Sequence, residues 1–514
     1  MTKLKGGTRP PWVGLGAAVW VQIAVGNAYT FPLYSPSFKS VLAFNQTQVS
    51  LLGVANDIGE NVGLLPGIVC NKFPPWLMLF IGGLFSFLGF GLLWLSISLT
   101  LPSLPYPLLW FALVIATNSC AWLSTALLVT NMRNFPASRG TVAGIIKGYG
   151  GISAAVFTEI FRTLLHNSSS NFLLFLAVGI PVLCFTVMFL VRPCTPVSGE
   201  STSEKWHFLF IQGSSVALEE NELGESNGEE NTKPLLHESS SSAALGSFND
   251  ADGSSEIDML LAEGEGAVVP SKKRRPRRGE DFTFLEALVK ADFWLLFSVY
   301  FAGVGTGVTV INNLAQIGAA QGVEDITILL SVFSFFNFVG RLGGGVVSEH
   351  FVRTRTIPRT VWMTCTQIVM IILYLLFAHA IKGTLYPAVG FLGICYGVQF
   401  SILIPTVSEL FGLKHFGLFF NFMSLGNPLG ALLFSALLAG RIYDSELAKQ
   451  QALGLVASSV SCVGPDCFKI TFLVLAAVCV AGAISSIILT IRIKPVYQML
   501  YSGGSFRLPQ MTCQ

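Results

Sequence analysis

The chain has 514 residues, of which 52% are hydrophobic and only 12% are charged, and its formal net charge is +2 at pH 7. Soluble globular proteins carry about 25% charged residues, so this composition excludes an ordinary soluble domain. Repeated apolar stretches of about 20 residues instead indicate a polytopic membrane protein. The net charge is uninformative as a total, and its distribution along the chain matters instead; we expect no nucleic-acid partner.

Apolar segments of membrane-spanning length occur six times before the middle of the chain and six times after it. The first six cover residues 12–36, 47–70, 76–98, 107–131, 138–165 and 171–191, and the second six cover residues 293–316, 325–349, 359–380, 385–409, 415–441 and 469–492. The intervening segment is rich in Ser, Glu, Gly and Asn, a composition typical of a disordered linker. We therefore expect an all-α membrane protein with six-helix halves at 1–192 and 291–497, a cytoplasmic linker at 193–290 and a cytoplasmic tail at 498–514.

Lysine and arginine residues in the short loops predict the orientation. Most of them fall on the side of the N-terminus and the linker, so both termini are expected in the cytoplasm. The two N-glycosylation sequons, at Asn45 and Asn167, fall on the opposite side. The segment CVGPDC also falls there, where Cys462 and Cys467 can form a disulfide. We expect a glycoprotein of the plasma membrane or of an endomembrane such as the tonoplast.

The two halves repeat one another. VGLLPGIVCN (62–71) aligns without a gap with VGRLGGGVVS (339–348), at an offset of 277 residues. Duplicated six-helix halves are typical of one large class of secondary transporter, in which the substrate site lies at the midplane between the halves. Chance recurrence of glycine-rich helix ends is the alternative.

The segment GRLGGGVVSEHFVRTR (340–355) resembles the cytoplasmic loop motif of the major facilitator superfamily, with Gly340, Arg341, Gly344 and Glu349 among its residues. Three further segments, RPPWVGLGAAVWVQ, NMRNFPASRGTVAGIIKGYGGISAA and RRGEDFTFLEALVKADFWLLF, resemble the plant nodulin-like branch of that superfamily, which includes the Nuclear Fusion Defective proteins. The resemblance implies twelve transmembrane helices in the major facilitator fold and a plant source. It implies little about the substrate.

The first copy of the loop motif departs from the superfamily pattern. Asn71 and Lys72 stand where an aspartate is usual. Arg133, at the cytoplasmic end of the fourth span, suits a latch better than a substrate site. Asn427 and Pro428, in NFMSLGNPLG, are expected to break or bend the eleventh span and to act as a hinge.

Asp57 and Glu60 lie within the second predicted span, about 20 Å and about 15 Å from its cytoplasmic end. A carboxylate at such depth costs about 2.5–3.5 kcal/mol, so two on one face need a counter-ion, a proton or water. Lys147, about 14 Å into the fifth span, is the expected counter-ion. The equivalent positions of the eighth span are Ser334 and Asn337, so the acidic pair is not duplicated. We expect Asp57, Glu60 and Lys147 to couple charge or protons to transport, with a purely structural ion pair as the alternative.

Uncharged polar groups also lie near the midplane of spans 1, 4, 7 and 10, which the resemblance places around the central cavity. They are Asn27, Tyr29, Asn118, Thr306, Thr309, Tyr396 and Gln399. Together they suit a small polar or weakly anionic solute, whereas each alone is more typical of an interhelical hydrogen bond. Arg341 lies deeper than a loop motif requires. We expect it to pair with Glu349 or a neighbouring helix rather than to bind an anion in the cavity.

The linker carries short recognition patterns. KKRRPRR (272–278) is expected to meet anionic lipid, and EIDMLL (256–261) fits an acidic dileucine sorting signal, so sorting or signalling proteins are candidate partners. The sequence contains no metal-ligand cluster, catalytic triad or phosphate-binding loop, and neither an enzyme nor a cofactor is expected.

Two functions remain open. One is a secondary-active transporter of a small solute, with a carboxylate as one candidate, working by alternating access with proton coupling. The other is a non-transporting sensor or scaffold that acts through its linker.

Overall fold

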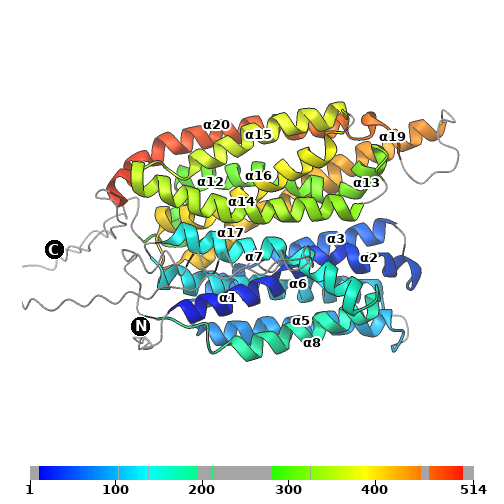
Figure 1. Ribbon diagram of the computed structural model, residues 1–514, viewed down its shortest axis with the longest axis horizontal. Helices are drawn as coiled ribbons and strands as arrows, with labels where there is room; N and C mark the ends of the chain where they lie inside the picture. Colours follow the sequence, from blue (N-terminus) through cyan, green and yellow to red (C-terminus); the bar gives the residue numbers. More distant parts are fainter. Residues whose placement is uncertain are drawn as a thin grey trace, which may run out of the picture. The chain divides into compact units, whose positions relative to one another are not determined.

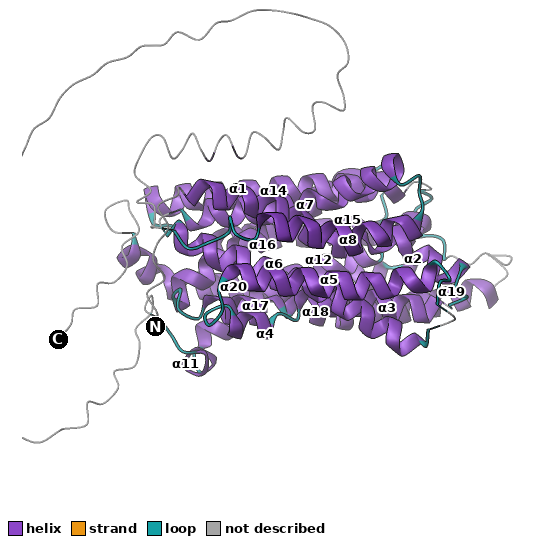
Figure 2. Cartoon of the chain, turned by 90° about the horizontal axis from the view of Figure 1, so that it is seen from below, coloured by secondary structure: helices purple, strands orange, loops and turns teal. Residues whose placement is uncertain are grey.

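The computed structural model describes residues 11–44, 46–101, 104–136, 138–194, 208, 211, 281–323, 326–381, 383–452 and 462–501. All regular elements in these ranges are helices (Figure 2). Nine of the described helices are long and apolar enough to cross a membrane. The other three predicted spans are also helical, but two of them are broken into shorter helices and one is more polar. The chain is a multi-pass, all-α membrane protein, as the sequence predicts.

The helices of the N-terminal half follow the six predicted spans. The first span is α1 (Pro11–Val25), the 3-10 segment η1 (Gly26–Thr30) and α2 (Phe31–Ser40), and the second is α3 (Gln46–Asn61) and α4 (Leu64–Val69). The next four are α5 (Pro75–Ile97), α6 (Tyr106–Asn134), α7 (Arg139–Glu159) continued by the π-helical η2 (Ile160–Leu164), and α8 (Ser169–Val187).

The C-terminal half begins with the short helix α11 (Phe284–Leu288). Its first four spans are α12 (Ala291–Asn312) with α13 (Leu314–Ala320), α14 (Ile326–Arg355), α15 (Thr360–His379) and α16 (Leu385–Phe411). The fifth span consists of four consecutive segments, α17 (Phe416–Ser424), α18 (Gly426–Gly430), η3 (Ala431–Ala439) and α19 (Gly440–Ala452). The last span, α20 (Lys469–Leu500), follows the turn η4 (Pro465–Cys467). In Figure 1 the blue to cyan helices and most of the green to red helices form two groups, with α7 running along α14.

The interruptions in the helices have local causes. The second span breaks at Gly63, and the amide of Asn118 donates hydrogen bonds to the carbonyls of Gly59 (3.0 Å) and Val62 (2.8 Å), which have lost their helical partners. The eleventh span is interrupted between α17 and α18, next to Pro428, and continues as the π-helical η3. Proline has no backbone N–H to continue an α-helix, and for this reason the sequence predicts a break near Pro428. The irregular backbone lies in that segment.

The two halves approach each other closely where the residues at their interface are glycines, which have no side chain. A Cβ atom built on Gly345 of α14 would lie 2.6 Å from the carbonyl oxygen of Gly140 and 2.8 Å from the Cα of Gly144, both on α7. A second close approach joins α4 and α17, where a Cβ on Gly67 would lie 2.7 Å from the carbonyl oxygen of Gly417. Small residues allow such backbone contact between membrane helices, so these positions set how closely the halves pack.

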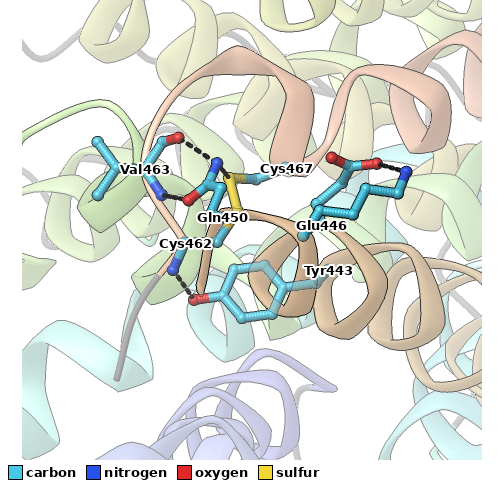
Figure 3. The surroundings of a disulfide bond; sticks show 7 residues. Tyr443, Glu446, Gln450, Cys462, Val463 and Cys467 are labelled. Carbon is cyan, nitrogen blue, oxygen red and sulfur yellow. Dashed lines mark hydrogen bonds and ion pairs between the residues drawn. A yellow bond between two sulfur atoms is a disulfide. The ribbon is translucent and has the colours of Figure 1, made fainter. Parts of the chain in front are cut away.

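The two ends of the bundle differ in their connections. We call the end at which α8 ends and α11 begins the linker end. The opposite end holds α13, α19 and the exposed Asn167, whereas Asn45 lies outside the described residues. There Cys462 and Cys467 are joined by a disulfide (Figure 3).

Side chains of α19 hold the disulfide loop in place. The hydroxyl of Tyr443 accepts a hydrogen bond from the N–H of Cys462 (3.0 Å). The amide of Gln450 pairs with both backbone groups of Val463, at 2.8 and 3.1 Å (Figure 3). The N–H of Gly464 donates to the carbonyl of Ala320 at 2.9 Å, which connects the loop to α13.

A side chain at Gly345 is predicted to push the halves apart, because the atoms in its way are backbone atoms. We expect Gly345→Val to lower the thermal unfolding midpoint of the detergent-purified protein by several degrees, since overpacking costs about 1–3 kcal/mol. Gly343→Val on the same helix is the matched control, because nothing lies within 4 Å of its Cβ position. Equal unfolding midpoints for the two variants, measured by scanning fluorimetry, would contradict the prediction.

Candidate functional site

A cavity of about 40 Å³ lies between the two halves. Its walls come from α1, η1, α3, α6 and α7 on one side and from α14, α16 and α17 on the other. A water molecule needs roughly 10–15 Å³ of such volume, so in this conformation the cavity accommodates only a few solvent-sized groups. Its polar lining includes Gln22, Tyr29, Glu60, Ser124, Lys147 and Arg341.

Arg341 is the C-terminal half's charged contribution to the cavity, and it is only 2% exposed. Its Nε donates to Oδ1 of Asn337 (3.0 Å), Nη1 to the carbonyl of Lys147 (2.9 Å) and Nη2 to the hydroxyl of Tyr29 (3.4 Å). The guanidinium lies over the ring of Phe400, 4.7 Å from its centre. Of the two expected partners of Arg341, Glu349 is not among its described contacts, whereas the neighbouring helix α7 is. Its partners are its own helix and the N-terminal half, and it faces the cavity.

Glu60 and Lys147 line the same cavity from α3 and α7. Glu60 interacts electrostatically with Lys147 and Arg341 and with the hydroxyl of Tyr29. The Nζ of Lys147 donates to Oγ of Ser124 at 2.8 Å and lies 5.3 Å from the ring centre of Phe420. Among the described contacts, Lys147 and Glu60 thus share a cavity without a direct hydrogen bond between them.

Asp57 lies outside this cavity lining, one helical turn before Glu60. Its Oδ2 accepts a hydrogen bond from Nδ2 of Asn312 on α12 (3.1 Å), so its side chain contacts the other half. The two acids that the sequence groups together therefore occupy different surroundings: Glu60 faces the cations, and Asp57 faces an amide.

Of the seven uncharged residues that the sequence places around the cavity, only Tyr29 lines it. Thr306 and Thr309 donate to carbonyls one turn back on their own helix, at 2.6 and 2.9 Å. Gln399 donates to the carbonyl of Met363 and to the hydroxyl of Thr366. These three residues are packed inside the C-terminal half.

The remaining three residues also serve packing. Asn27 donates to the carbonyl of Ala24 at 2.9 Å. Asn118 binds the broken end of α3, and Tyr396 lies against the ring of Phe400, with 4.9 Å between the ring centres. The sequence reasoning missed several residues that do line the cavity: Gln22, Ser124, Phe400, Phe420, Asn421 and Ser424. For Asn421 and Ser424 a signal existed, because they are three residues apart on one face of a helix.

A buried group of charges closes the linker end. We call Arg139, Glu349, Arg353, Arg359, Glu409 and Tyr501 the linker-end network. Arg359 forms ion pairs with Glu409 (2.8 Å) and Glu349 (2.7 Å), and Glu349 also pairs with Arg353 (2.9 Å). The hydroxyl of Tyr501 donates to Glu409 at 2.6 Å. The network therefore joins α14, α16 and the end of α20 around the fully buried Arg359.

The same network binds the N-terminal half. The N–H of Gly140 donates to Oε2 of Glu349 (2.9 Å), and Nη2 of Arg353 donates to Oγ of Ser138 (3.1 Å). Nη1 of Arg139 lies 3.4 Å from the carbonyl and the hydroxyl of Ser408. Glu349 of the loop motif thus connects the start of α7 to the C-terminal half.

Arg133 makes a smaller connection at this end. Its Nη2 donates to Oδ1 of Asn71 (2.5 Å) and to the carbonyl of Leu413 (3.4 Å), which belongs to the other half. A hydrogen bond from Arg133 to the amide oxygen of Asn71 therefore takes the place of an ion pair in the first copy of the motif. The motif glycines Gly340 and Gly344 face α16, because Cβ atoms there would lie 2.3 Å from the carbonyl of Ile394 and 2.7 Å from Oγ of Ser401.

Comparison with known proteins agrees with this architecture. Residues 11–224 match the Nodulin-like family model, and residues 280–499 match the model of the NFD4 C-terminal domain. Protein NUCLEAR FUSION DEFECTIVE 4 of Arabidopsis thaliana is 28% identical over 95% of this chain and 90% of its own length. The uncharacterized MFS-type transporter YhjX of Escherichia coli (strain K12) is 27% identical over 30% of this chain and 38% of its own.

A solved structure supports the fold assignment. The crystal structure of the major facilitator superfamily transporter FucP, in the outward conformation, has a TM-score of 0.52 to this chain. The match covers 92% of this chain and 98% of FucP at 14% sequence identity. This likeness shows the fold.

Removing one acid of the linker-end network is predicted to lower the stability of the folded protein more than removing an acid at the surface. Glu409→Ala leaves the guanidinium of Arg359 buried with fewer partners, and breaking such a pair costs about 3–5 kcal/mol. Glu446→Ala is the control, since its partner Lys449 is exposed and a surface pair is worth at most about 1 kcal/mol. We expect a clear drop in thermal midpoint or in monodisperse yield for Glu409→Ala alone. Similar losses for both variants would refute this.

Proposed function

Because the chain belongs to the nodulin-like membrane proteins of the Nuclear Fusion Defective type, with the major facilitator fold, we propose that it is a secondary-active transporter of a small solute. The proposed substrate class is small carboxylates, the mechanism is alternating access without enzymatic chemistry, and protons are the proposed coupling ion. The observation that carries the proposal is the cavity between the halves, into which Glu60, Lys147 and Arg341 converge.

The charges of the cavity suit an anion. Two cations and one carboxylate leave one formal positive charge when Glu60 is ionised, and two when it is protonated. Burying charge in a membrane is costly, so an anionic solute that neutralises the excess gains a strong, charge-assisted hydrogen bond. Lys147 is the better anion ligand of the two cations, because Arg341 already donates to three protein acceptors.

The size of the cavity favours a solute with few heavy atoms. A volume of about 40 Å³ corresponds to only a few water molecules. Phe400 and Phe420 are among the residues whose side chains bound this volume. A carboxylate with a short carbon chain fits such a site better than a sugar or a long-chain acid.

Glu60 is the proposed proton-binding group. It is the carboxylate in the cavity wall, and its interactions with Lys147 and Arg341 change when it gains or loses a proton. Asp57 has a different proposed role, because its contact with Asn312 joins the two halves. A polar or ionisable side chain within a bundle is a common site of proton coupling in transporters.

The arrangement of the halves supports alternating access. The linker-end network holds α7 against α14 at one end, and both helices carry residues of the cavity. In such transporters one half rocks against the other around a central site. We further propose that the linker end faces the cytoplasm and that Asn167, at the opposite end, is open to glycosylation.

The transport proposal predicts uptake of short monocarboxylates into proteoliposomes that contain the purified protein. Lys147→Gln removes a charge-assisted hydrogen bond worth about 1.5–3 kcal/mol, so the KM should rise roughly 10- to 100-fold. Lys449→Gln, at an exposed surface position, is the control and should transport normally. Absence of uptake across a broad panel of anionic and neutral solutes would instead favour a sensor or scaffold.

Glu60→Gln is predicted to separate accumulation from exchange. A neutral amide imitates the protonated carboxyl group, so a proton gradient can no longer drive accumulation, whereas exchange of internal for external solute continues. Asp57→Asn lies on the same helix outside the cavity lining and should keep proton-driven accumulation. The two variants are compared by uptake with and without an imposed pH gradient. Equal loss of accumulation in both would assign coupling to the acidic pair rather than to Glu60.

A further inference from the structure

A second cavity, of about 210 Å³, lies at the linker end of the C-terminal half. Its walls are formed by the segment before α11, the start of α12, the last residues of α16 and the last third of α20. No residue of its lining belongs to the lining of the cavity between the halves. It therefore needs a separate explanation from the proposed transport site.

This cavity combines two cations with one acid. Asp292 is buried and accepts a hydrogen bond from Nε of Arg492 at 2.6 Å, which fixes the guanidinium beside the cavity. Lys290 reaches the same cavity from the residue before α12, with its Nζ 5.7 Å from the ring centre of Phe282. Among the described lining residues the cations outnumber the acid by one, which suits an anion.

The surroundings of the cavity are apolar and exposed. Val289 precedes Lys290 and is 86% exposed, and Ile491 precedes Arg492 and is 69% exposed. Trp294, on the first turn of α12, is half exposed, and its Nε1 donates to the carbonyl of Leu288 at 2.8 Å. Tryptophan with a bound N–H and an exposed ring is typical of the boundary between hydrocarbon and headgroups. The cavity thus lies at headgroup depth with apolar side chains beside it.

We propose that this cavity binds the phosphate-bearing headgroup of an anionic phospholipid. Lys290 and Arg492 donate to the phosphate oxygens, as ammonium and guanidinium groups commonly do. The acyl chains lie against the exposed apolar side chains of α12 and α20, such as Trp294 and Ile491. The apolar walls and neighbours favour a lipid over a soluble phosphate, because free phosphate gains nothing from them.

The position of the cavity connects lipid binding to the linker-end network. Leu410 and Phe411 line the cavity, and Leu410 directly follows Glu409 of the network on α16. A headgroup held between α12 and α20 packs against this end of α16. Bound lipid therefore stabilises the part of the C-terminal half in which the network is anchored.

The test measures binding of fluorescent dioleoyl phosphatidic acid to the full-length protein in neutral detergent. A lysine or arginine near a membrane surface raises the affinity for anionic lipid about fivefold. Lys290→Gln should therefore raise the apparent Kd roughly fivefold. The double variant Asp292→Asn, Arg492→Gln removes both members of the ion pair between Asp292 and Arg492, so neither is left without the other, and it should weaken binding as well. The thermal midpoint in phosphatidylcholine verifies that each variant is folded.

Three controls decide between the sources of binding. Lys494→Gln removes an exposed cation two residues after Arg492 and outside the cavity, and it should leave the Kd unchanged. An equal loss with Lys494→Gln would overturn the proposal in favour of general surface charge. Competition by inorganic phosphate as strong as that by phosphatidic acid would overturn the lipid assignment, and so would equal affinity for dioleoyl phosphatidylcholine. None of these measurements depends on transport activity, so they stand apart from the proposed function.

Discussion

Arg341 carries a charge in a site that is almost closed to solvent, and a buried guanidinium needs acceptors for its fork of donors. Its own helix supplies one acceptor, Asn337, whereas the other two are the carbonyl of Lys147 and the hydroxyl of Tyr29 from the opposite half. These acceptors come within reach because α7 lies against α14 at a separation that only glycine permits. Arg341 can therefore keep all three of these hydrogen bonds only while the two halves are closely packed.

The same pair of helices carries the charges that close the linker end. Glu349 lies two turns beyond Arg341 on α14, and it accepts a hydrogen bond from the first turn of α7. A rocking motion that separates α7 from α14 would break both sets of contacts together. In the proposed transport cycle, opening of the linker end and exposure of the cavity cation are consequently one event, because both depend on one helix interface.

The duplicated halves share a backbone plan but divide the charges between them. At the offset of 277 residues, Glu60 of the first half corresponds to Asn337 of the second, and Arg341 corresponds to Leu64. The N-terminal half thus contributes the acid Glu60 and the cation Lys147 to the cavity, and the C-terminal half contributes the cation Arg341 from across the interface. Burying a cation and an acid in one cavity lowers the cost that either would have alone in a membrane. Because equivalent positions of the two halves carry different charges, the cavity between two similar folds is electrostatically asymmetric.

The sequence by itself determined the helical spans, the halves and the break near Pro428, because hydropathy and proline chemistry act over a few turns of one helix. It also singled out Glu60 and Lys147, since a charge inside a span is conspicuous whatever surrounds it. It failed for Thr306, Gln399 and most other uncharged candidates, because such side chains can bond to their own helix or to any neighbour. For Arg341 it left Glu349 and a neighbouring helix open as partners, and the contacts lie with the neighbouring helix. Only the tertiary structure decided these cases, because the rotation of each helix about its axis, fixed by glycine contacts between helices far apart in sequence, determines which polar groups reach the cavity.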